Sequence, residues 1–235
     1  MFNLQAETIR PAVVATKKSL SPPPLRAMTA SPLPATLPAA LIAAAAYARR
    51  GEIDRTTLLP AAITAMPFAI AGALLSPLVG GPALLTLSGL FLGLLGLGLL
   101  RPVKPAATRV EATEHRRSRT IACTAVAAFA SGLLANGGAA VLIPLLVLVV
   151  GLNYRTAAGT SLLVVPFITL PAVITHSALG HVNWAIAASF AAGAVPAAAL
   201  GARLAPRVSQ ANLQRSLGWL LLAFATAFTI HQFLN

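Results

Sequence analysis

The sequence predicts an all-α polytopic membrane protein, a bundle of helices with about seven apolar segments arranged as an inverted-topology repeat. Hydrophobic residues make up 57% of the 235 positions and charged residues only 9%, against about 25% charged residues in soluble domains. Long stretches carry no charge at all, among them 56–100, 120–154 and 156–202. About 18 uncharged apolar residues suffice for a membrane helix. A soluble enzyme, a nucleic-acid binder and a disulfide scaffold are therefore excluded.

The placement of charge favours the same class of protein. Seventeen Lys and Arg outweigh five acidic residues and give a formal charge of +12. The cations lie in short gaps between apolar spans, as expected of cytoplasmic loops, so the expected partner is the lipid bilayer and not nucleic acid. All five acids precede residue 115. The second half therefore has no carboxylate for a cation site or a proton relay, which favours a small anion as cargo.

Turn signals divide the chain into successive elements. Residues 1–33 form a polar leader, rich in Ser, Thr and Pro, which we expect to be disordered. Glycine and proline then separate apolar runs from one another. The elements in order are 34–48, 56–100 divided at Gly80-Gly81-Pro82, a basic loop at 101–119, 120–152 interrupted at Asn136-Gly137-Gly138, 158–202 divided at Gly180, and 212–232.

An internal repeat underlies this pattern. A shift of 129 residues places Gly51-Glu52-Ile53-Asp54 on Gly180-His181-Val182-Asn183, and 11 of the 29 positions from 61 to 89 are identical to their counterparts. Upstream, after a four-residue gap, Thr36-Leu37-Pro38-Ala39 matches Thr169-Leu170-Pro171-Ala172. We therefore divide the chain into an incomplete first repeat at 34–100 and a second repeat at 120–235.

Charge orients the two copies in opposite directions. Arginines flank the early loop of the first copy (Arg49, Arg50 and Arg55) but the late loop of the second (Arg203, Arg207 and Arg215). If basic loops face the cytoplasm, the copies are inverted relative to one another, as in many secondary transporters. The stretch 120–152 must then enter and return on one side, as two short, broken segments.

Candidate binding residues lie at two places in the second copy. Broken helices expose backbone groups that bind ions, so Asn136, Gly137 and Gly138 are the first candidates for a substrate site. Glycine packing between helices is the alternative explanation for that run. Thr160 and Ser161 are the second candidates, although such hydroxyls also bond to their own backbone. His176 and His181 do not share a helical face, so we expect no metal site and no cofactor.

These motifs together resemble the second repeat of the sulfite exporter (TauE/SafE) family. The resemblance rests on the run from Gly132 to Leu146, on Ala157-Ala158-Gly159-Thr160-Ser161-Leu162, on Gly180-His181-Val182-Asn183 and on Gly201-Ala202-Arg203-Leu204. Tyr47-Ala48-Arg49-Arg50-Gly51-Glu52-Ile53-Asp54 resembles the matching part of the first repeat. The resemblance to this family implies a multi-pass protein of the bacterial inner membrane that exports sulfite or organosulfonates, and not an enzyme.

Two departures from the family pattern bear on activity. The glycine run has Ala139 where the family has a third glycine, and the first copy lacks its glycine-rich opening segment. We therefore expect the chain to be shortened at its N-terminus, and an active form to need a homodimer or a longer product. The alternative is an inactive remnant of the family with only a structural role.

Overall fold

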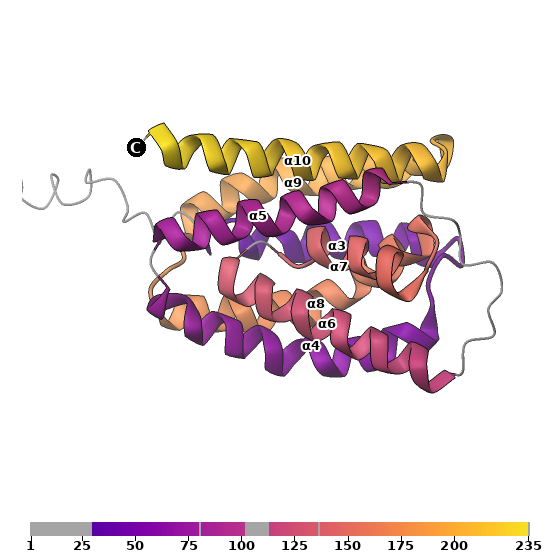
Figure 1. Ribbon diagram of the computed structural model, residues 1–235, viewed down its shortest axis with the longest axis horizontal. Coiled ribbons are helices and arrows are strands. Elements are labelled where there is room, and N and C mark those ends of the chain that lie inside the picture. Colours follow the sequence, from indigo (N-terminus) through magenta and orange to yellow (C-terminus); the bar gives the residue numbers. More distant parts are fainter. Residues whose placement is uncertain (1–29, 80, 102–112, 136, 235) are drawn as a thin grey trace, which may run out of the picture.

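The computed structural model describes residues 30–79, 81–101, 113–135 and 137–234. Within these ranges the chain forms eight α-helices and no strand (Figure 1). The predicted all-α fold is therefore confirmed, and the eight described helices correspond to the expected segments, with 120–152 forming two as predicted. The leader at 1–33 lies almost entirely outside the described residues.

The helices follow the predicted elements closely. Three of them are long and apolar enough to span a membrane, at Arg55–Leu78, Tyr154–Ala178 and Trp184–Arg207. Short 3-10 turns at Ser76–Leu78 and Ala205–Arg207 extend two of these. The helices are α3 (Leu33–Ala48), α4 (Arg55–Leu75), α5 (Gly81–Leu100), α6 (Thr113–Leu134), α7 (Ala139–Leu145, continued by a π turn at Leu146–Val150), α8 (Tyr154–Ala178), α9 (Trp184–Leu204) and α10 (Gln210–Leu234).

The two copies of the repeat have the same local structure. Helices α4 and α9, the two 3-10 turns, and α5 and α10 all begin 129 residues apart. Asp54 caps α4 by accepting a hydrogen bond from the Thr56 N–H, and Asn183 caps α9 by accepting from Ala185 and Ile186. Such short polar side chains satisfy the unpaired amides of a helix N-terminus. A side-chain oxygen in the same place, from Asp in one copy and from Asn in the other, thus caps the equivalent helix twice.

Contacts between α5 and α10 show the opposite orientation of the copies. A Cβ added at Gly93 would meet Ala225, whereas one added at Gly96 would lie 2.9 Å from the Gly218 carbonyl oxygen. Moving forward along α5 therefore moves backward along α10, and Figure 1 shows the two helices side by side in opposite directions. Because α5 and α10 are equivalent elements, one copy is inverted relative to the other.

Two equivalent hydrogen bonds tie the copies together. Helix α3 packs on α9 and α4 on α8, so the first helix of each copy lies against the second helix of the other. The Asn183 N–H donates to the Ser31 hydroxyl and the Asp54 N–H donates to the Thr160 hydroxyl, both at 2.9 Å. Ser31 and Thr160 are themselves 129 residues apart. The structural equivalence thus continues upstream without the four-residue gap expected from sequence.

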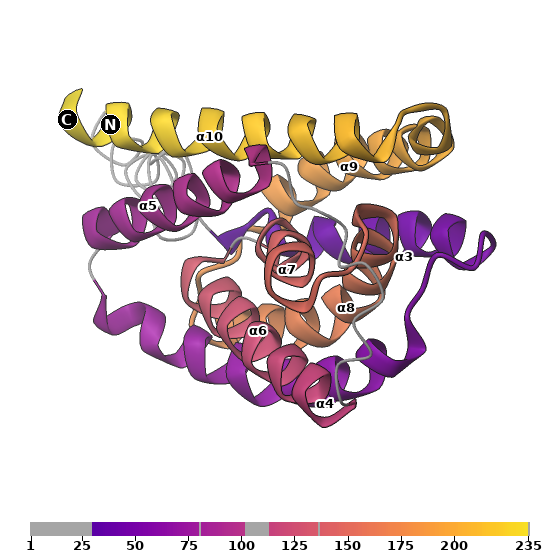
Figure 2. The ribbon, with the colours of Figure 1, turned by 45° about the vertical axis from the view of Figure 1, so that its right-hand side comes forward.

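The stretch 120–152 forms two segments as predicted, but the first belongs to a helix that begins earlier than expected, at Thr113. Helix α6 has 22 residues, but its first turns are charged, and it is not among the three described helices that are long and apolar enough to span a membrane. It begins within the stretch expected to be a basic loop, because Arg116 extends the helix outward to pair with Asp54. Only the return segment, α7 with its π turn, is short, and Figure 2 shows α7 surrounded by the longer helices.

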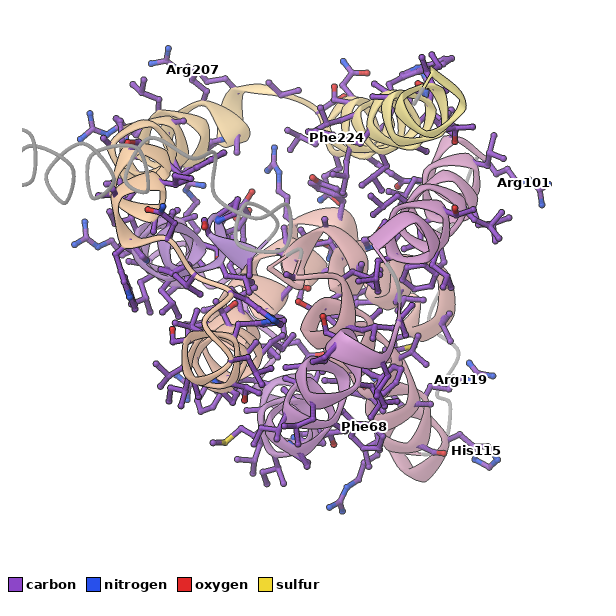
Figure 3. The ribbon with its side chains drawn as sticks, turned by 90° about the vertical axis from the view of Figure 1, so that its left-hand side faces the viewer. Phe68, Arg101, His115, Arg119, Arg207 and Phe224 are labelled. Carbon is purple, nitrogen blue, oxygen red and sulfur yellow. The ribbon has the colours of Figure 1, made fainter. Side chains whose placement is uncertain are left out.

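The described arginines gather at one end of the bundle. There Arg50 donates to the Ala202 carbonyl at 2.6 Å, and Arg155 donates to the Val208 carbonyl at 2.9 Å. Figure 3 shows Arg101, Arg119 and Arg207 projecting outward from the helices. The loop before α9 lies at the other end, beside Ser31. The two loops predicted to face opposite sides are therefore at opposite ends, and which side each faces stays a prediction.

Candidate functional site

The break between α6 and α7 is built on left-handed backbone. Ala135, Gly137 and Gly138 have φ angles of 54°, 77° and 78°. Glycine adopts these angles without steric cost, whereas Ala135 is a strained exception. Asn136, the remaining predicted residue of this run, lies outside the described residues. The predicted interruption of the helix is observed at the expected place.

Helices α3 and α8 form the walls of the break. A Cβ added at Gly137 would lie 2.9 Å from the Thr36 methyl carbon, and one added at Gly138 would lie 3.0 Å from Ile168. The Thr36 hydroxyl lies 3.5 Å from the hydroxyl of Thr169, across the contact between α3 and α8. The glycines thus permit close approach of a broken backbone to Thr36 on α3 and to Ile168 on α8.

Ser131 provides an unused polar group at the break. It is fully buried, and its hydroxyl has no hydrogen-bond partner in the structure. That oxygen lies 3.4 Å from where a Cβ of Gly138 would be. A buried hydroxyl without a partner costs about 1–3 kcal/mol, so such groups commonly await a ligand or water. The sequence did not single out Ser131, because a single serine in an apolar helix gives no indication that it is buried without a partner.

The structure does not bring Thr160 and Ser161 into contact with the break. Ile168, which faces Gly138, follows Thr160 by eight residues, or about 12 Å along α8. The Thr160 hydroxyl is occupied by the Asp54 amide, so it joins two helices instead of bonding to its own backbone. The Ser161 hydroxyl is buried and has no partner in the structure. A substrate role for this pair stays a prediction.

Two histidines meet at the end of α8, where His176 contacts Gly132 of α6 just before the break, although sequence spacing had placed the histidines apart. Nδ1 of His176 lies 3.4 Å from Nδ1 of His181, and the two rings are 5.7 Å apart. The chain reverses at Gly180, with a φ of 71°, and the His181 N–H donates to the His176 carbonyl at 2.9 Å. This is the Schellman motif, which brings together the residues on either side of the helix end. A glycine directly after an apolar helix was the signal that could have predicted the contact.

Comparison with known proteins identifies the family. The profile of the family described as "Sulfite exporter TauE/SafE" matches residues 9–228. The chain belongs to the TauE/SafE family. It is also similar to the "Probable membrane transporter protein YunE" of Bacillus subtilis (strain 168), with 26% identity over 175 residues, 68% of this chain and 64% of the relative. The matched part thus spans just under two thirds of that relative. No solved structure matches the chain.

The basic end of this TauE/SafE protein is held together by charge. Arg155, which sequence placed at the mouth of the bundle, bonds the Pro206 and Val208 carbonyls and lies 3.8 Å from Glu52. It therefore anchors α8 to the end of α9. Burial alone would raise the pKa of Asp54, but hydrogen bonds from Thr56 and its neighbour and the charge of Arg116 lower it below its usual value. The Asp54 carboxylate is thus committed to structure, whereas Glu52 also has a buried oxygen, Oε2, without a hydrogen-bond partner.

A cavity of about 390 Å³ lies away from the break in this TauE/SafE protein, between α4, α5 and α6. Its lining is apolar and includes Phe68, Phe91 and Phe129. Apolar walls offer nothing to an anion, whose binding needs hydrogen-bond donors or positive charge. The break, with its hydroxyls, is therefore the stronger candidate for the functional site of the family member.

Proposed function

We propose that this TauE/SafE protein is a multi-pass secondary transporter of the bacterial inner membrane that exports a small anion, of the class of sulfite and the organosulfonates. The break between α6 and α7 would hold the anion. The observation that carries this proposal is the buried, unpartnered hydroxyl of Ser131, placed against the glycine backbone at the break. Discontinuous helices near the bilayer midplane form the substrate sites of many secondary transporters.

The chemistry of the lining supports an anion as the ligand. Ser131 and Thr169 offer hydroxyl groups that can donate hydrogen bonds, whereas the Thr36 hydroxyl already donates to the Leu33 carbonyl at 2.7 Å. The sequence has no Asp or Glu between residues 55 and 110 or after residue 114, so α3, α7 and α8 carry no carboxylate to repel an anion, and the single acid of α6, Glu114, lies at the start of that helix. A metal cation would meet no carboxylate ligand there. The family description and the name of the relative agree with transport of this kind.

Efflux from proteoliposomes tests the proposal. Vesicles loaded with sulfite, isethionate, sulfoacetate or taurine would report which of these leaves through the protein. Ser131→Ala removes the hydroxyl with little change of shape, and a lost hydrogen bond to an anion is worth about 1.5–3 kcal/mol. We therefore expect the apparent affinity to fall by about tenfold or more. Gly137→Leu should block efflux, because its Cβ would collide with Thr36.

A matched control separates loss of the site from loss of the fold. Ser189 is an exposed serine whose hydroxyl bonds the Ala185 carbonyl one turn earlier in α9. Ser189→Ala should leave efflux unchanged, while all variants insert in the membrane to the same extent. Efflux at the wild-type level from both Ser131→Ala and Gly137→Leu would show that the break is not the site.

A further inference from the structure

The histidine pair at the end of α8 has a geometry suited to holding a proton. Nε2 of His176 lies 2.9 Å from the Gly132 carbonyl oxygen. A carbonyl can only accept a hydrogen bond, so this nitrogen must carry its hydrogen in every charge state. Nδ1 is therefore the atom of His176 that gains or loses a proton. It faces Nδ1 of His181 at 3.4 Å, and one proton can be shared between the two nitrogens.

The pair also connects the surface to the interior. His176 is 1% exposed, whereas His181 lies half-buried in the loop before α9. A proton that binds Nε2 of His181 allows the proton on Nδ1 of His181 to move to Nδ1 of His176. One N–H bond forms on each ring and one breaks at His181. The net result is one added proton, with its positive charge on the buried ring.

Among the residues that the structure describes, no negative group lies against His176 to balance that charge. From the loop, His181 is the titratable group that faces it, and from α6 the group that faces it is the Gly132 carbonyl. The charged residues of α3, α4, α6 and the start of α8 lie at the opposite end of the bundle. No carboxylate follows residue 114 in the sequence. A buried cation without a counter-ion is strongly disfavoured.

An anion in the break would be that counter-ion. Gly132, which bonds His176, is followed by the break and preceded by Ser131, whose hydroxyl points to Gly138. We propose that His176 and His181 form a proton-binding site, and that a proton there and an anion in the break bind together. The inference rests on the proposed function, since it assigns the proton as the coupling ion. Each ligand must then raise the affinity of the other by the same factor.

Calorimetry on the purified full chain tests the linkage directly. Isethionate is the probe because it keeps a single negative charge over the working pH range. Titrations in two buffers of different ionisation enthalpy give the number of protons taken up per anion bound. We expect net proton uptake by the wild type, and an apparent affinity that falls by up to about tenfold per pH unit as pH rises, the limit for one linked proton.

Three variants make the test specific. His176→Gln keeps a donor for the Gly132 carbonyl but cannot titrate, so it should bind isethionate without proton uptake and without pH dependence. His181→Gln should lose much of the pH dependence. His115, exposed near the start of α6 (Figure 3), provides the matched control, and His115→Gln should behave as the wild type does.

The outcomes separate this inference from the proposed function. Isethionate binding by the wild type without proton uptake would overturn the inference and leave the transport proposal standing. The same holds if His176→Gln retains the wild-type proton uptake. If the wild type binds neither isethionate nor sulfite, the proposed function itself fails, and the linkage fails with it.

Discussion

Glycine is indispensable at one position of the first copy and dispensable at the equivalent position of the second. A Cβ added at Gly72 of α4 would lie 2.1 Å from the Phe129 carbonyl oxygen and 2.8 Å from the Leu133 amide nitrogen, both backbone atoms of α6. Its counterpart in α9, Gly201, has no atom within 4 Å of an added Cβ. The same substitution, Gly→Ala, should therefore have opposite effects at the two sites.

The magnitude follows from the collision. A carbon normally approaches a backbone oxygen to about 3.3 Å, so α4 and α6 would have to separate by about 1 Å. Neither backbone can rotate out of the way as a flexible side chain could. Overpacking of this kind costs about 1–3 kcal/mol or more, and we expect Gly72→Ala to lie near the upper end. At Gly201 the helix preference for alanine, about 1 kcal/mol, is the only change expected, and it is stabilising.

Thermal unfolding in detergent, followed by tryptophan fluorescence, measures both effects. For a chain of this size a loss of about 3 kcal/mol corresponds to a fall in Tm of about 6–12 °C. Gly201→Ala should unfold at the wild-type temperature or slightly above it. Gly132→Ala provides the reciprocal check, because its Cβ would lie 2.1 Å from the Ala69 carbonyl oxygen. Equal Tm values for Gly72→Ala and Gly201→Ala would refute the reasoning.

Three further predictions concern the ends of the bundle. Ser31→Ala and Thr160→Ala each remove one of two equivalent hydrogen bonds, so chemical denaturation should give them similar losses of about 1 kcal/mol; a large difference would contradict the symmetry. Because the folded state lowers the pKa of Asp54 below its usual 3.8, its stabilising effect is present above that value and disappears as pH falls through the folded pKa. At neutral pH, Asp54→Asn should therefore be less stable than the wild type by about 1 kcal/mol, a small value because the side chain is partly exposed. Its Tm should be correspondingly lower and should not show the decrease that the wild type shows in acid. Single cysteines in the loops before α9 and before α10 should be labelled from the periplasm and the cytoplasm respectively, and the reverse pattern would overturn the assigned orientation.

Most of the fold could be predicted because its signals are local. Uncharged runs mark helices, and glycine or proline marks their ends. The repeat was visible because equivalent turns kept equivalent residues, such as Asp54 and Asn183. The start of α6 could not be predicted from the sequence, because its first residues include arginines of the kind expected in a loop. Only the structure shows that Arg116 pairs with Asp54.

The site was predicted less completely, because it depends on contacts between distant segments. Glycine at positions 137 and 138 marked the break itself, but its walls come from α3 and α8. Thr36 and Thr169 meet only because the equivalent helices α3 and α8 pack on each other. The spacing of residues in the sequence does not indicate that the Ser131 hydroxyl is buried without a hydrogen-bond partner. The hydrogen bond that Thr160 accepts from the Asp54 amide was likewise not visible in the sequence, and a substrate role for Thr160 stays a prediction.

The exchange of partners between α3, α4, α8 and α9 has a consequence for biogenesis. During synthesis α4 can pack on α6 as soon as that helix is made, but α3 has to await both α8 and α9, on which it packs. Helix α3 must therefore remain loosely held in the lipid until translation has passed residue 204. Completion of the bundle is therefore a late event. Two fragments divided at the loop after α5 should recover the native bundle only when they are expressed together in one cell.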